Sequence, residues 1–224
     1  PDGWFPRWCV ELYPDAAGGA TKDNKKGWGC CYPRRKEYIR GVWPKYILKN
    51  EERNGRHFGK SLSFLEGFGG AAGLPAWVEE IVEAGACAMF IDNAGFVWAH
   101  RKGQSKDEWI WTIAKMMEDF CRGVGVKLRL FHTGRRTTVG ERVADALSKG
   151  DWKEVEREMP GAVDVSGRKS VVLDRWLHDP RVDRDMASRV LREVSTRVDV
   201  PIGKNYVLEM EEMLREERLK EEEG

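Results

Sequence analysis

The sequence lacks the cysteine patterns that bind zinc or form a disulfide framework. Its 224 residues include five cysteines, an odd number, and no two of them make a C-x-x-C pair. Buried apolar thiols are the simpler interpretation, and free thiols favour a reducing compartment, the cytoplasm or the nucleus. No apolar run is long enough to span a membrane, and no segment resembles a signal peptide. These absences predict an intracellular protein that is not associated with a membrane.

A strong overall charge is also missing, because the net charge is only +1. Residues 207–224 carry eight Glu against three basic residues, so the rest of the chain has a balance of +6. Its basic residues gather in short clusters, which attract phosphate groups. A cluster of this kind is more often a solvated surface, so nucleic-acid binding needs further support.

The order of the expected elements is βββ-α-β-α-β-α, followed by a helical tail. This order predicts an α/β fold with a five-stranded mixed sheet and helices on both faces. The first domain would span residues 1–150, and residues 151–224 would form a helical C-terminal extension. The strands are expected at 8–15, 28–33, 37–48, 86–91 and 127–132, and the helices of the first domain at 61–72, 105–123 and 141–148.

Two details of this pattern concern where helices begin. Pro75 is expected to open a second helical piece that runs to Glu83, because proline is favoured in the first turn of a helix. Ser105 and Glu108 have the S-x-x-E spacing of a capping box, so the amphipathic helix is expected to begin there.

Four acidic residues lie where this architecture would bring them together. Asp15 ends the first strand, Glu66 lies in the first helix, Asp92 follows the apolar run 86–91, and Asp145 lies in the last short helix. A carboxylate directly after a buried strand is costly unless it is solvated or coordinates an ion. Taken alone, each residue has an ordinary interpretation as a turn, helix-surface or ion-pair carboxylate. Together they predict a metal site.

Carboxylate oxygens are the ligands that Mg²⁺ and Mn²⁺ prefer. Two such ions, about 4 Å apart, can activate a water molecule and stabilise the leaving oxygen of a phosphodiester. We therefore expect Asp15, Glu66, Asp92 and Asp145 to be catalytic residues that hold two Mg²⁺ or Mn²⁺ ions.

The short sequence motifs around these residues resemble those of the ribonuclease H (RNase H) domains of retroelement polyproteins. The resemblance rests on Asp15-Ala16-Ala17 with Gly27-Trp28-Gly29, on Leu65-Glu66, on Ile91-Asp92-Asn93-Ala94 and on Ala144-Asp145-Ala146-Leu147-Ser148. The resemblance covers about residues 8–150, and its most specific motif is the one at residues 144–148. The stretch from Asp92 to Asp145 and the added helices are most similar to tyrosine-recombinase (DIRS-like) retrotransposons.

The resemblance implies an RNase H-like fold and a metal-dependent endoribonuclease, which cuts the RNA strand of an RNA/DNA hybrid during reverse transcription. It implies an upstream reverse transcriptase domain of the same polyprotein as a partner. His132, at the start of the loop before Asp145, is a candidate for assisting turnover. Ala16, Ala17, Asn93, Arg135 and Arg136 are the residues that we expect to contact nucleic acid.

Two rival interpretations stay open at this point. One is a catalytically silent RNase H-like scaffold or nucleic-acid-binding module, which would have no need of four carboxylates. The other is a DNA-cutting enzyme of the integrase or resolvase type on the same fold. The motif at residues 144–148 argues against this second alternative.

Overall fold

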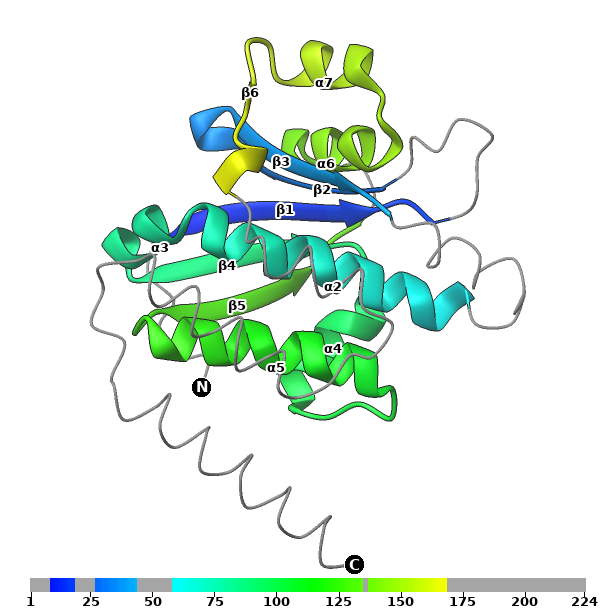
Figure 1. The fold of residues 1–224 in the computed structure, drawn as a ribbon, viewed down its shortest axis with the longest axis vertical. Coiled ribbons are helices and arrows are strands. Elements are labelled where there is room, and N and C mark those ends of the chain that lie inside the picture. Colours follow the sequence, from blue (N-terminus) through cyan, green and yellow to red (C-terminus); the bar gives the residue numbers. More distant parts are fainter. Residues whose placement is uncertain (1–8, 19–26, 44–57, 135–136, 169–224) are drawn as a thin grey trace, which may run out of the picture.

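The computed structural model describes residues 9–18, 27–43, 58–134 and 137–168 (Figure 1). These residues form an α/β fold with a six-stranded mixed sheet. The strands are β1 (Val10–Ala16), β2 (Gly27–Tyr32), β3 (Glu37–Val42), β4 (Ala86–Ile91), β5 (Lys127–His132) and β6 (Val163–Asp164). The helices are α2 (Phe58–Ala76), α3 (Val78–Ala84), α4 (Ala94–Lys102), α5 (Glu108–Gly123), α6 (Val139–Lys149) and α7 (Trp152–Glu158), with short 3-10 turns at Pro33–Arg35 and Ser166–Arg168.

The strands are arranged in the order β5-β4-β1-β2-β3-β6. Strands β1, β2 and β3 pair antiparallel, whereas β4 is parallel to β1 and β5 is parallel to β4. The expected meander and mixed sheet are therefore confirmed. The expected count of five strands is corrected to six, because the two-residue strand β6 pairs parallel with β3. A strand of two residues has too little alternation to be recognised in a sequence.

Helices cover both faces of the sheet, as expected. Helix α2 packs on β1 and β2 from one side, and α6 packs on the same two strands from the other (Figure 1). Side chains alternate between the faces along a strand. Thus Leu12 lies in the core beneath α2, whereas its neighbour Tyr13 lies with Leu147 in the smaller core beneath α6.

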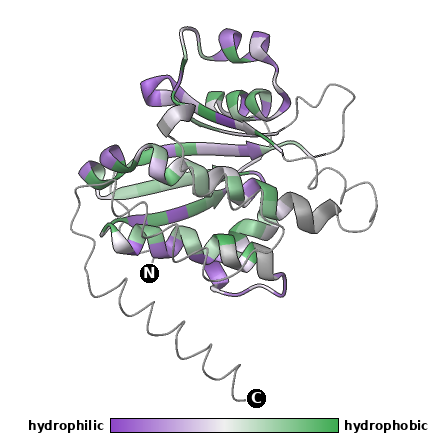
Figure 2. Ribbon diagram, in the orientation of Figure 1, coloured by the Kyte–Doolittle hydropathy of each residue, from purple (hydrophilic) through white to green (hydrophobic). Residues whose placement is uncertain are grey.

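Strand β4 lies inside the sheet between β1 and β5, and its sequence is continuously apolar. Figure 2 colours it green along its length. Five of its six residues are buried and Phe90 is partly buried, as expected for a strand that is covered on both faces. The predicted strand 86–91 coincides with β4, so the position of Asp92 just beyond the strand is also confirmed.

Helix α2 contains five glycines, and those at positions 69 and 73 let it lie close to the sheet. A Cβ atom at Gly69 would lie 3.3 Å from the backbone oxygen of Gly29, and one at Gly73 would lie 2.9 Å from the sulfur of Cys30. The helix continues to Ala76 with Pro75 inside it, and α3 begins only at Val78. The expectation that Pro75 opens the second helix is therefore wrong.

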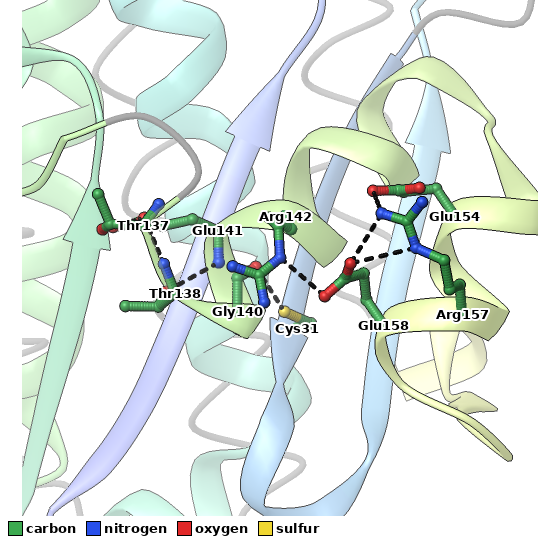
Figure 3. Close-up of polar contacts among 9 residues, drawn as sticks. All are labelled: Cys31, Thr137, Thr138, Gly140, Glu141, Arg142, Glu154, Arg157 and Glu158. Atoms are coloured by element: carbon green, nitrogen blue, oxygen red, sulfur yellow. Dashed lines mark hydrogen bonds and ion pairs between the residues drawn. The ribbon is translucent and has the colours of Figure 1, made fainter.

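Helix α6 is held in place at its N-terminus and along one side (Figure 3). The side chain of Thr138 accepts a hydrogen bond from the backbone N–H of Glu141, whose carboxylate accepts one from the backbone N–H of Thr138. This reciprocal capping box satisfies two backbone donors. The ion pair between Arg142 and Glu158, at 2.7 Å, links α6 to α7.

Glycine also sets the distance between α6 and the sheet. A Cβ atom at Gly29 would lie 2.5 Å from Cβ of Leu147, whose side chain is fully buried. We expect Gly29→Ala to lower the free energy of unfolding by about 1–3 kcal/mol, because well-packed cores tolerate added volume poorly. Urea denaturation measures this loss.

Gly167→Ala is the matched control for this substitution, because a Cβ atom there meets nothing within 4 Å. Its free energy of unfolding should stay within about 0.5 kcal/mol of the parent protein. Equal stability of Gly29→Ala and the parent would contradict the close approach of α6 to β2.

Two further features differ from the expected pattern. Helix α4 was not expected, and it begins after Asn93, whose side chain accepts a hydrogen bond from the backbone N–H of Phe96. At the start of α5, Asp107 rather than Ser105 accepts the capping hydrogen bond, from Ile110. An Asn or Asp before a helix is a common cap, so both signals were present in the sequence.

The first part of the expected C-terminal extension packs with the sheet, to which it adds strand β6. Residues 151–168 form α7, β6 and a 3-10 turn, and Val155 and Met159 pack into the core beneath α6. The expected helical segments beyond residue 168 lie outside the described residues, as do residues 44–48 of the third expected strand.

Candidate metal centre

The register of the sheet brings Asp15 and Asp92 to the same edge. Strands β1 and β4 run parallel, and Leu12 pairs with Met89. Asp15 and Asp92 each lie three residues further along, so both lie at the carboxyl ends of neighbouring strands. Ligands commonly bind at this edge of an α/β sheet.

Glu66 joins these two aspartates from helix α2. Carboxylate oxygens of Asp15, Glu66 and Asp92 all lie within 4.8 Å of one another, a separation at which one metal ion can contact all three. Glu66 is only 3% exposed, and its Oε2 atom has no hydrogen-bond partner among the described residues. A buried carboxylate oxygen without a partner is costly, and a cation would supply what it lacks.

Asp15, Glu66 and Asp92 form an acidic triad, in which burial and repulsion between the carboxylates raise the pKa values of Asp15 and Glu66. Burial raises the pKa of Asp15 to about 6, and the charges of Asp92 and Asp145 add to the rise. Burial likewise raises the pKa of Glu66 well above its usual value, with further contributions from Asp15 and Asp92. Carboxylates that repel one another in this way are arranged to receive positive charge.

Asp145 lies in α6, near the triad. It does not belong to the group of carboxylates whose oxygens lie within 4.8 Å of one another. Its carboxylate pairs with Lys149 one helical turn later, and its side chain is 21% exposed. Its charge nevertheless contributes to the raised pKa of Asp15. The structure therefore brings three of the four predicted ligands together and places the fourth beside them.

Ser148 ends the motif at residues 144–148, but it was not predicted to be a site residue. Its hydroxyl lies 2.5 Å from Oδ2 of Asp15 and 2.9 Å from the backbone oxygen of Asp145, and its side chain is fully buried. Residues three apart share a face of a helix, so the spacing from Asp145 to Ser148 was the signal for it.

His132 ends β5 and is exposed. Its backbone pairs with Ile91, the residue before Asp92, so it lies one strand away from the triad at the same edge of the sheet. It is not a member of the metal-binding group. Its assistance to turnover stays a prediction.

The five residues predicted to contact nucleic acid differ in their burial and hydrogen bonding. The side chains of Ala16 and Ala17 are buried, and the backbone N–H and oxygen of Ala17 already bond with Gly27 and Trp43. Asn93 caps α4 and accepts a hydrogen bond from Ser63 at 2.9 Å. Arg135 and Arg136 lie outside the described residues. Contact of all five with nucleic acid stays a prediction.

Comparison with protein-family models, with curated proteins and with solved structures found no match. The architecture and the acidic triad are therefore the observations that bear on function. Within the described residues, no helix has both the length and the apolar character that crossing a bilayer requires.

The donor set of the triad fits a hard divalent cation. It consists of oxygen ligands alone, and no histidine or cysteine belongs to the group. Magnesium, manganese and calcium select such ligands, whereas zinc and copper favour nitrogen and sulfur. The triad could thus bind a metal ion, and the orphaned oxygen of Glu66 gives a physical reason for it to do so.

Proposed function

We propose that this protein is a metal-dependent endoribonuclease with an RNase H-like fold, which hydrolyses the RNA strand of RNA/DNA hybrids during reverse transcription. The observation that carries the proposal is the convergence of Asp15, Glu66 and Asp92 from three separate elements within 4.8 Å. Carboxylates distant in sequence that meet at a sheet edge, where repulsion destabilises the protein, need a functional reason.

The arrangement of the elements supports the same proposal. Three antiparallel strands, then two strands parallel to the first, with helices on both faces, agree with the fold that the resemblance implies. The four carboxylates occur on the elements where that resemblance places them, namely β1, α2, the end of β4, and α6.

The protein would use these residues in distinct ways. Asp15, Glu66 and Asp92 would hold Mg²⁺ or Mn²⁺, and Asp145 would complete the site for two ions. When bound, the ions supply positive charge that neutralises the phosphate during hydrolysis. Asp145 is more suitable than Glu66 for contact with incoming substrate, because it is more exposed. Lys149 holds this carboxylate in place while substrate is absent.

The protein would act together with a partner domain and inside the cell. An upstream reverse transcriptase domain of the same polyprotein would deliver the hybrid, and the reaction would occur in the cytoplasm or nucleus. Recognition of a hybrid requires contacts with the 2′-hydroxyl groups of one strand, which its minor groove displays.

The experiment that tests the proposal compares three labelled substrates under identical conditions. RNA/DNA hybrid, double-stranded RNA and double-stranded DNA are incubated with excess protein, which compensates for weak binding by a domain without its polymerase. Each is tested with Mg²⁺, with Mn²⁺ and with chelator. We expect cutting of the RNA strand of the hybrid alone, and only with metal.

Two results would reject the proposal. Cutting of double-stranded DNA in preference to hybrid would favour an integrase-like enzyme. Failure to cut any substrate with either metal, under conditions where the protein binds hybrid, would favour the catalytically silent module.

A further inference from the structure

Ser148 is a fully buried hydroxyl that contacts the triad without belonging to it. Its Oγ lies 2.5 Å from Oδ2 of Asp15 and 2.9 Å from the backbone oxygen of Asp145. A serine hydroxyl has one proton and can donate to only one of these acceptors at a time. The shorter contact is with the carboxylate, and hydrogen bonds to charged acceptors are the stronger ones. The proton therefore goes to Asp15.

This hydrogen bond fixes the orientation of one metal ligand. It engages Oδ2 of Asp15, whose carboxylate belongs to the group that lies within 4.8 Å of Glu66 and Asp92. Carboxylates that bind metals are usually oriented by such a second partner. We propose that Ser148 is a positioning residue, which orients Asp15 so that the triad binds its divalent cation tightly. The inference rests on the metal centre of the proposed function.

The helix that carries Ser148 is itself fixed, so the hydroxyl is held at a defined height above β1. Leu147, the preceding residue, packs against Gly29, which pairs directly with Asp15 across the two strands. At the other end of α6, the sulfur of Cys31 donates a hydrogen bond to the backbone oxygen of Gly140 at 3.3 Å (Figure 3). The sheet thus holds both partners of the Ser148–Asp15 contact.

A purely structural role gives a different expectation. A serine in a helix often donates to the backbone oxygen of the preceding turn, and the Asp145 oxygen is such an acceptor. If that were the role of Ser148, its removal would change stability slightly and would leave metal affinity unchanged. Metal affinity, measured without substrate, therefore separates the two roles.

The experiment measures the Kd of the full chain for Mn²⁺ by calorimetry, at a fixed pH near 7.5, for the parent and three variants. Ser148→Ala removes the donor, and we expect its Kd to rise by about 10- to 100-fold. Ser148→Cys keeps the shape of the side chain with a somewhat larger atom and has only a weak donor, so a similar rise is expected. Ser166→Ala is the matched control, because the hydrogen bond that Ser166 accepts comes from the backbone of Arg40 on β3 and not from a triad residue. Its Kd should equal that of the parent.

The outcomes distinguish this inference from the proposed function. If Ser148→Ala or Ser148→Cys binds Mn²⁺ as tightly as the parent does, the positioning role is overturned, whether or not the protein cuts hybrid. If Ser148→Ala does not fold, the Kd of Ser148→Cys decides between the two roles. If the parent binds Mn²⁺ and cuts no hybrid, the nuclease proposal fails, while a raised Kd in the variants still supports Ser148. A parent that binds no Mn²⁺ overturns both.

Discussion

Asp92→Asn is expected to lower metal-dependent cutting of an RNA/DNA hybrid by more than about 100-fold, which exceeds the loss typical of residues that only orient a metal ligand. Asparagine keeps the shape of the side chain and removes its charge. Asp92 lies directly beyond β4, and its carboxylate lies within 4.8 Å of those of Asp15 and Glu66, so this substitution removes one of the three negative charges of the triad. Single-turnover assays on labelled hybrid measure the effect.

The same substitution should leave the metal-free protein at least as stable as the parent. Asp92 adds to the repulsion that raises the pKa of both Asp15 and Glu66, and its neutralisation relieves that repulsion. In chelator we expect the Tm to rise by about 2–4 °C for each kcal/mol relieved. Mg²⁺ should raise the Tm of the parent and leave that of Asp92→Asn nearly unchanged, because bound ligand stabilises only a protein that binds it.

Asp164→Asn serves as the control for charge removal outside the metal centre. Asp164 is exposed in β6 and accepts a hydrogen bond from the backbone of Ser166 at 2.8 Å. This variant should keep both the activity and the Mg²⁺-dependent rise in Tm. Full activity of Asp92→Asn would show that the triad is not the catalytic metal centre.

The sequence predicted those features that depend on continuous apolar patterns. The run at residues 86–91 predicted β4, and the parallel register then carries Asp92 to the edge where Asp15 lies. The antiparallel strands β1 to β3 followed from alternating aromatic and β-branched residues. Three of the four predicted ligands meet because Asp15 and Asp92 lie at the ends of strands that the patterns located, and Glu66 lies within the helix predicted at 61–72.

Features that depend on close packing between distant elements could not be predicted. By helix propensity alone the glycines of α2 weaken a helix, whereas Gly69 and Gly73 let that helix approach β1 and β2. Single-residue propensities do not include such tertiary contacts. Ser148 was missed for the same reason, because its hydrogen bond to Asp15 spans 133 positions in sequence.

The metal-free protein is expected to lose stability as the pH rises from about 4 to 7. The pKa of Asp15 is 3.8 in its reference state and rises to about 6 in the folded protein, so the folded state holds the proton more tightly. Below pH 3.8 both states are protonated and the folded state incurs no penalty. Above about pH 6 both are ionised, and the folded state is destabilised by about 3 kcal/mol. Glu66, whose pKa is raised in the same direction, adds to this loss.

Other carboxylates oppose this trend, so a matched variant is needed to isolate it. The side chain of His100, whose Nε2 lies 3.3 Å from the carboxylate of Glu118, lowers the pKa of Glu118, which therefore stabilises the fold as the pH rises. Asp15→Asn keeps this opposing contribution and removes that of Asp15. In chelator, urea denaturation should show that the free energy of unfolding of the variant, relative to that of the parent, increases by about 3 kcal/mol between pH 4 and pH 7. A difference that does not change with pH would contradict the raised pKa of Asp15.

Divalent metal should reverse the pH dependence of the parent protein. A carboxylate must lose its proton before it can hold a cation, so protonation of Asp15 and Glu66 competes with binding. We therefore expect the Kd for Mg²⁺ to rise steeply as the pH falls below about 6, the pKa of Asp15. In saturating Mg²⁺ the parent should be more stable at pH 7 than at pH 5, whereas in chelator the contribution of the triad has the opposite sign. Asp15→Asn should show neither effect of Mg²⁺, because the repulsion that destabilises the metal-free triad is also what attracts the ion.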